Sequence, residues 1–412
     1  ALGYRHGLAA WWWVGSAGIA TILLAFWLGP RVWRLAQRYD LKTVGDLLEL
    51  RYGSAVRFTI AVLLWFGTLA ILASQLIAMA WILNVVAGVP RGWGCLLSGA
   101  VMTAYFTAGG LLTSAWVNLV ELAVLLLGFA LALPLALAAV GGTARLSAEA
   151  SPEWQGFFAS GDVGWSLLFL LVPAFLVSPG LLQKIYGARD ERAVRVGVSW
   201  CGFALLLFAA VPPLLGMIAS LHGAQLASDD LALPVVLTQL LPLAIGIIGL
   251  AAVLSAEISS ADAILFMLST SLSEDLYRRF LRPRASDREV LRVARLAAVA
   301  GGVLGIVLAL YLPSVIAGMR VFYSLLGVSL FVPVVAAVHG RLGGQLEALA
   351  SIATGCGVRL ALHFGWLDSP WQDDLSAIVA SAAVFLLLVL VRRRPGPLPE
   401  DPGRPASEGV PR

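Results

Sequence analysis

The chain is built from long runs of apolar residues that short polar connections separate. A run of about 20 apolar residues is long enough for a helix to cross the hydrocarbon core of a bilayer. The runs predict about eleven transmembrane helices, at residues 8–29, 56–84, 93–108, 113–140, 163–185, 193–221, 240–279, 289–311, 314–338, 345–363 and 375–392. We therefore expect an all-α polytopic membrane protein whose transmembrane domain covers residues 1–394.

The composition supports a membrane protein and argues against several other classes. Hydrophobic residues make up 59% of the 412 positions and charged residues 13%, whereas soluble domains contain roughly 45–50% apolar and 25% charged residues. The formal net charge is only +4, so we expect the lipid bilayer and no nucleic acid as a partner. The scattered Cys95, Cys201 and Cys356 and the four histidines form no metal-ligand motif.

Arginine placement predicts the orientation of the chain. Alternate connections contain Arg31, Arg34, Arg38, Arg51 and Arg57, then Arg189, Arg192 and Arg195, then Arg278, Arg279, Arg282, Arg284, Arg288, Arg292 and Arg295, then Arg341, and finally Arg392, Arg393 and Arg394. The opposite connections contain little beyond Arg5, Arg91 and Arg145. The positive-inside rule therefore places the basic connections and the C-terminus in the cytoplasm. The Pro- and Gly-rich residues 395–412 predict a disordered cytoplasmic tail.

Two connections and one span contain signals of local structure. Thr43 and Asp46 stand at capping-box spacing, which indicates either a short surface helix or a solvated connector, and we expect the connector. A short helix is predicted near Leu231–Leu240. Within span 163–185, Ser178 and the helix breakers that follow it predict an interrupted helix, because proline lacks a backbone donor. Such a break either lines a substrate cavity or is a packing kink.

The stretch from Leu250 to Arg279 combines apolar residues with acids and hydroxyls. Five polar residues recur at helical spacing and share one face, namely Ser255, Ser259, Asp262, Ser269 and Ser273. The hydroxyls of Ser259 and Ser260 lie one turn from the backbone carbonyl of Ala256, and hard cations favour such oxygen ligands. The alternative is that these hydroxyls bond helix carbonyls or neighbouring helices. The presence of Asp262 favours cation binding over a purely structural role, because an acidic residue inside a membrane usually has a function.

Four stretches of the sequence carry a resemblance to a known family. They are TVGDLLELRYGSAVR, AGGLLTSAWVNLVEL, SPGLLQKIYGARDERAVRVG and AAVLSAEISSADAILFMLSTSLSEDLYRR. Together they resemble the sodium/solute symporter family of proline, pantothenate, sialic-acid and sugar symporters. The resemblance implies a LeuT-type core of two inverted five-helix repeats with extra helices. It also implies that a leading helix and most of the first core helix precede ALGYRHGLAAWWW in the complete protein.

The resemblance assigns ion sites to individual residues. The sodium ligands would be the carbonyl of Ala256 and the hydroxyls of Ser259 and Ser260. The family usually has a Thr-Asp pair where this chain has Val117 and Asn118, and a Gln at Glu121. Asp262 stands where several relatives have a Ser that helps to form a second cation site. We therefore assign Asp262, together with Asn118, to a second cation or a proton.

The function implied is sodium-coupled import of a small organic solute, an amino acid or a carboxylate, across the bacterial inner membrane. Gln75 and Ser178 are the candidate substrate contacts, because each places hydrogen-bonding capacity inside an apolar span. The alternative for Gln75 is a hydrogen bond to a neighbouring helix. The alternative is a transporter-like solute sensor that signals through a partner. No enzyme is expected, because neither HExxH nor GxSxG occurs, and Na⁺ is the only expected cofactor.

Overall fold

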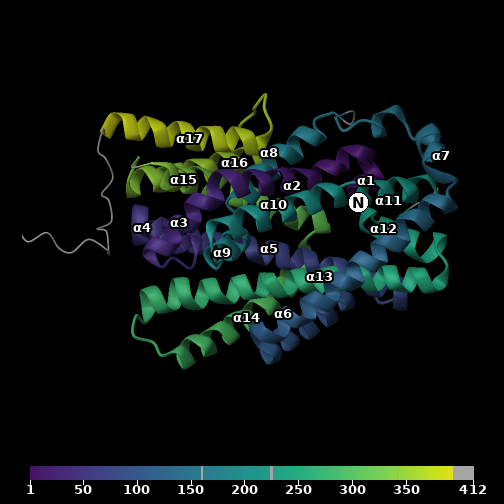
Figure 1. Ribbon diagram of the computed structural model, residues 1–412, viewed down its shortest axis with the longest axis horizontal. Coiled ribbons are helices and arrows are strands. Elements are labelled where there is room, and N and C mark those ends of the chain that lie inside the picture. Colours follow the sequence, from purple (N-terminus) through teal and green to yellow (C-terminus); the bar gives the residue numbers. More distant parts are fainter. Residues whose placement is uncertain (159–160, 223–225, 341, 393–412) are drawn as a thin grey trace, which may run out of the picture. The chain divides into compact units, whose positions relative to one another are not determined.

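A computed structural model describes the chain apart from residues 159–160, 223–225, 341 and 393–412, and apart from the side chains of residues 108–119. Every regular element in this part is helical (Figure 1). The α-helices are α1 (Leu2–His6), α2 (Trp11–Leu23), α3 (Gly29–Tyr39), α4 (Val44–Tyr52), α5 (Ser54–Ala87), α6 (Arg91–Ala139), α7 (Gly142–Glu149), α8 (Val163–Leu176), α9 (Pro179–Tyr186), α10 (Glu191–Phe208), α11 (Val211–Leu221), α12 (Ala232–Val235), α13 (Leu243–Thr270), α14 (Asp287–Tyr311), α15 (Val315–His339), α16 (Gln345–His363) and α17 (Asp373–Arg392). Three short 3₁₀ segments are η1 (Gly7–Ala10), η3 (Pro152–Trp154) and η4 (Asp229–Leu231), and three π-helical segments are η2 (Leu24–Leu28), η5 (Val236–Leu240) and η6 (Ser271–Leu281).

Nine helical stretches among the described residues are long and apolar enough to cross a membrane. Residues 93–108 and 113–140, which we predicted as two spans, form the single helix α6 of 49 residues, so the expected break between them is wrong. The connecting glycines permit a break but do not force one, since they retain the backbone donors that proline lacks. At 1.5 Å per residue, α6 is about 74 Å long, more than twice the hydrocarbon thickness.

The chain divides into two compact units, which we describe separately. The first contains residues 1–17, 63–168 and 204–324, and the second contains residues 18–62, 169–203 and 325–412. In the first unit, α13 packs along α6 and α14. The approach of α13 to α6 is close at Gly128, where an added Cβ would lie 2.4 Å from the Cβ of Ala252. Glycine thus sets the helix spacing at this point, as small residues do in membrane interfaces.

The second unit contains α16 and α17, which pack against each other, and α3, which packs against α9. The hydroxyls of Ser351 and Ser381 lie 2.7 Å apart and join α16 to α17. The Trp33 indole N–H donates to the Ala188 carbonyl oxygen at 2.9 Å and fixes α3 beside the loop that precedes α10. Interhelical hydrogen bonds of this kind stabilise packing where water is absent.

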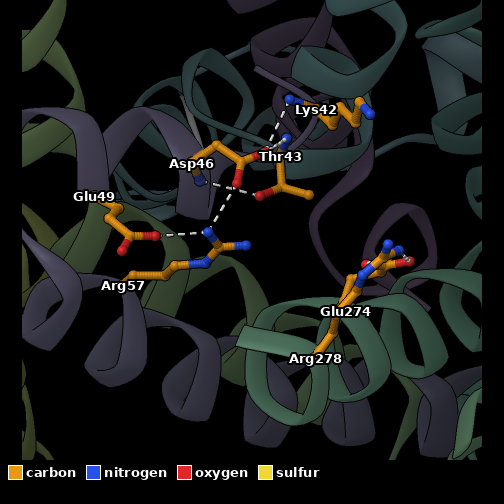
Figure 2. Close-up of polar contacts among 7 residues, drawn as sticks. All are labelled: Lys42, Thr43, Asp46, Glu49, Arg57, Glu274 and Arg278. Atoms are coloured by element: carbon orange, nitrogen blue, oxygen red, sulfur yellow. Dashed lines mark hydrogen bonds and ion pairs between the residues drawn. The ribbon is translucent and has the colours of Figure 1, made fainter. Parts of the chain in front are cut away.

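The polar connection that contains Thr43 and Asp46 is a helix rather than the solvated connector that we expected. Thr43 accepts a hydrogen bond from the Asp46 backbone, and the Asp46 carboxylate accepts one from the Thr43 backbone, so both halves of a capping box form. Arg57 at the start of α5 lies 2.9 Å from Asp46 and 2.7 Å from Glu49 (Figure 2). The Tyr52 hydroxyl donates to the Pro333 carbonyl oxygen at 3.0 Å and ties α4 to α15. These contacts explain why this polar stretch folds.

The two other local predictions are confirmed. Span 163–185 is interrupted between α8 and α9, with Ser178 as the N-cap and Pro179 as the first residue of α9. Proline is favoured at this position because the first helical N–H has no partner within the helix. The short helix expected near Leu231–Leu240 is present as η4, α12 and η5 in succession.

Candidate functional site

The candidate sodium ligands lie on an uninterrupted turn of α13. Ala256 and Ser259 are partly exposed and Ser260 is exposed, although they lie near the middle of a 28-residue apolar helix. A helix places residues three and four apart on one face, so the two hydroxyls and the Ala256 carbonyl are near one another by local geometry. Oxygen atoms of these kinds can coordinate a hard cation. This face of α13 therefore offers a polar, accessible surface inside the span.

Asp262 lies one turn further along α13 and is buried, with 1% of its surface exposed. Two residues of α6, Tyr105 and Glu121, interact electrostatically with its carboxylate. Glu121 is also buried, and its Oε2 atom has no hydrogen-bond partner among the described residues. The side chain of Asn118, which we expected beside Asp262, lies outside the described part of the chain. The structure thus brings two carboxyl groups from α6 and α13 into one polar cluster.

Two carboxylates in a low-dielectric interior repel each other unless a positive charge lies between them or one carries a proton. The cluster of Tyr105, Glu121 and Asp262 can therefore bind a cation or retain a proton. We noted Glu121 in the sequence only as a departure from the family pattern. Its position within an apolar helix was the signal that could have identified it.

The hydroxyls nearer the arginine-rich end of α13 have a structural role. Ser269 donates to the Phe266 carbonyl oxygen at 3.0 Å, and Ser273 in η6 donates to the Thr270 carbonyl oxygen at 3.4 Å. Bonds to carbonyls three or four residues back are the usual way in which helical serines satisfy their hydroxyls. Ser269 and Ser273 thus have local hydrogen-bond partners within the helix, and Ser259 and Ser260 stay the predicted sodium ligands.

Glu257 is a second acid on the same helix that the sequence left without a partner. Its Oε2 atom is buried and has no hydrogen-bond partner among the described residues. Another acid, Asp230, acts on it electrostatically, and Asp230 Oδ2 accepts a hydrogen bond from the Val315 backbone at 3.1 Å. Glu257 lies within one turn of the candidate sodium ligands on α13.

The candidate substrate residues belong to different units, and each is described by itself. Gln75 lies on α5 in the first unit and is 4% exposed. Ser178 lies in the second unit at the interruption between α8 and α9, and its carbonyl oxygen accepts from the backbone of Leu181 at 3.1 Å and Leu182 at 3.0 Å. The part of the chain that is described contains no group of three or more His, Cys, Asp or Glu residues suited to a metal ion.

Comparison with known proteins identifies the family. The model of the sodium:solute symporter family matches residues 1–341. The chain belongs to the sodium:solute symporter family. Family members are transporters rather than enzymes, which confirms the expectation from the sequence that the chain is not an enzyme. Membership, together with several apolar helices, also shows a multi-pass membrane protein.

Two curated relatives and one solved structure define the similarity. The high-affinity proline transporter of Bacillus subtilis is 26% identical over 408 residues, which cover 94% of this chain and 84% of that protein. The high-affinity choline transporter of Caenorhabditis elegans is 24% identical over 338 residues, and the match spans only 58% of its length. A sodium-coupled sialic acid symporter in a substrate-bound, outward-open state matches with a TM-score of 0.70 at 15% identity and covers 96% of this chain and 91% of that one. This similarity confirms the predicted fold class.

Proposed function

We propose that the protein containing this chain is a sodium-coupled symporter that imports a small organic solute by alternating access. The observation that carries the proposal is the accessible pair of hydroxyls, Ser259 and Ser260, beside the Ala256 carbonyl in the middle of α13. Family membership supports sodium as the coupling ion. Its binding would favour one conformation of the transporter by its differential affinity for the two states.

The second cation or proton would occupy the polar cluster at Asp262. Asn118 belongs to this proposal through the resemblance of its stretch to the family pattern, and Glu121 adds a carboxyl group where that pattern usually has a Gln. One cation between Glu121 and Asp262 would offset their mutual repulsion in the membrane interior. The membrane potential would then favour inward movement of each coupled positive charge by roughly 2.3 kcal/mol per 100 mV.

The solute would be an amino acid or a carboxylate, with Gln75 and Ser178 as polar contacts. The relatives named for proline transport support an amino acid, whereas those named for choline transport make a quaternary ammonium compound a useful comparison. We place the protein in the bacterial inner membrane with its C-terminus in the cytoplasm, because the arginine-rich connections lie on that side.

A binding experiment tests the proposal. The full-length protein in detergent is screened by thermal unfolding against proline, choline, sugars and carboxylates, in Na⁺ and in K⁺ at equal ionic strength. A ligand that binds the native state stabilises it by mass action, so one class of solute should raise the unfolding temperature, and more so in Na⁺ than in K⁺. Equal stabilisation in both salts would contradict sodium coupling.

A further inference from the structure

An apolar groove lies on the second unit between η2 and α10. Its volume is about 450 Å³, within the range of ligand-binding pockets. The walls are aromatic and aliphatic side chains that are largely exposed: Phe26 is 62% exposed, Trp200 67% and Phe203 49%. The rings of Trp200 and Phe203 meet edge to face with their centroids 6.0 Å apart. In a membrane protein this surface faces lipid rather than water.

One end of the groove is positively charged. Arg195 lines the groove, and its Nη2 atom lies 2.6 Å from Oε1 of Glu191. The other carboxylate oxygen of Glu191 lies 2.8 Å from Nη1 of Arg34 on α3. Two arginines thus share one carboxylate and leave one positive charge uncompensated within this trio. Both guanidinium groups remain about half exposed, so each has donors available for a further anion.

The charge and the aromatic rings lie at different depths along α10. Arg195 is near the start of the helix, and Phe203 is eight residues, or about 12 Å, further along its axis. The start of α10 follows the arginine-containing connection that the positive-inside rule places in the cytoplasm. The charged end is therefore at the depth of lipid headgroups, and the aromatic end is at the depth of acyl chains.

Ser199 also lines the groove, between the charged and the aromatic ends. Its Oγ is buried, so the arginine at one end and the aromatic rings at the other are the groups that a ligand in the groove would contact.

We propose that this groove binds one phospholipid with an anionic headgroup. The headgroup phosphate contacts Arg195, and an acyl chain lies against Phe26, Trp200 and Phe203. Anionic lipid is favoured over zwitterionic lipid because the arginine–glutamate–arginine trio has a net positive charge, and the cytoplasmic leaflet is where anionic lipids attract basic residues. The proposal is independent of which solute the protein transports.

Native mass spectrometry of the delipidated full-length protein, titrated with phosphatidylglycerol or phosphatidylcholine, tests the proposal. The first phosphatidylglycerol should bind several-fold more tightly than the first phosphatidylcholine. Arg195→Ala should lower phosphatidylglycerol affinity about fivefold, as expected for one arginine near an anionic headgroup, and Arg195→Lys should retain most of it. The matched control is Arg189→Ala, because the Arg189 side chain is 92% exposed and pairs with its neighbour Asp190.

Two further variants separate charge from the apolar contact. Glu191→Gln should increase phosphatidylglycerol affinity, because it removes the carboxylate that Arg34 and Arg195 share. Trp200→Ala should weaken both lipids equally, whereas Trp93→Ala, at a tryptophan that is 65% exposed, should change neither. The proposal is overturned if phosphatidylglycerol shows no preference, or if Arg195→Ala and Arg189→Ala have the same effect.

Discussion

The ion cluster of Arg57, Asp46 and Glu49 gives a stability prediction whose size can be worked out. The Arg57 side chain is 9% exposed, and its two carboxylate partners, Asp46 and Glu49, are 24% and 15% exposed. Replacing Arg57 by Met keeps the aliphatic stem of the side chain but removes the charge. Figure 2 shows the Arg57 guanidinium in contact with both carboxylates, so the substitution leaves two partly buried carboxylates without their cation.

Removing one partner of a buried ion pair costs about 3–5 kcal/mol. Because both carboxylates retain some contact with solvent and can rehydrate, we expect Arg57→Met to lower the free energy of unfolding by about 2–3 kcal/mol. With an unfolding entropy of about 2.1 cal/mol/K per residue, a chain of 412 residues loses about 1.2 °C for each kcal/mol, so the unfolding temperature should fall by about 2–4 °C. The measurement is thermal unfolding of the detergent-solubilised protein, followed by tryptophan fluorescence.

The matched control is Arg145→Ala on α7, which removes an ion pair with Glu149 whose side chains are 61% and 45% exposed. Exposed pairs contribute little, so the unfolding temperature should change by less than about 1 °C. Combining Arg57→Met with Asp46→Asn and Glu49→Gln should restore at least half of the loss, because no uncompensated charge remains. The reasoning is refuted if Arg57→Met and Arg145→Ala unfold at the same temperature.

Three further predictions concern α13 and its contact with α6. Ser259→Ala and Ser260→Ala should each raise the sodium concentration for half-maximal uptake about tenfold, the usual effect of losing one bond to a charged group. The control Ser273→Ala should leave that concentration unchanged. Unchanged sodium dependence in both the Ser259 and the Ser260 variant would refute the assignment. Asp262→Asn should lower the ion-to-solute ratio or shift the pH profile of uptake. Asp262→Ser combined with Asn118→Asp should restore part of the lost coupling. If Asp262→Asn leaves both the ratio and the pH profile unaltered, the role of Asp262 is structural. Gly128→Ala should lower the unfolding temperature by about 1–2 °C, because overpacking costs about 1–2 kcal/mol. Gly197→Ala, where an added Cβ meets nothing within 4 Å, should not lower it.

Local signals in the sequence predicted local structure well. Proline after Ser178 was sufficient to predict the interruption between α8 and α9, because the missing donor acts on its own helix. The spacing of Thr43 and Asp46 indicated the capping box of α4, although we expected a solvated connector. The helix is also stabilised by ion pairs to Arg57, which lies beyond its end and so outside the local signal. The predicted break between residues 93–108 and 113–140 was wrong, because glycine permits both a break and a continuous helix.

Relations between helices were beyond the sequence. Asp262 was identifiable as a buried acid, but its neighbours Tyr105 and Glu121 depend on how α6 packs along α13, which spacing within one helix does not determine. Ser269 and Ser273 shared the periodicity of Ser259, and the hydrogen bonds that these two serines donate to helix carbonyls are visible only in the structure. Helical period fixes a face, whereas the partner on that face is fixed by tertiary packing.

Solute uptake by proteoliposomes containing the full-length protein tests the central claim most directly. The solute that stabilises the protein in Na⁺ is supplied outside, with an inward Na⁺ gradient, with an equal K⁺ gradient, or with the Na⁺ gradient collapsed by an ionophore. We predict accumulation above the external concentration with the Na⁺ gradient alone, and loss of that accumulation when the ionophore is added. Binding without accumulation under any gradient would favour a solute sensor, and equal accumulation with Na⁺ and K⁺ would contradict sodium coupling.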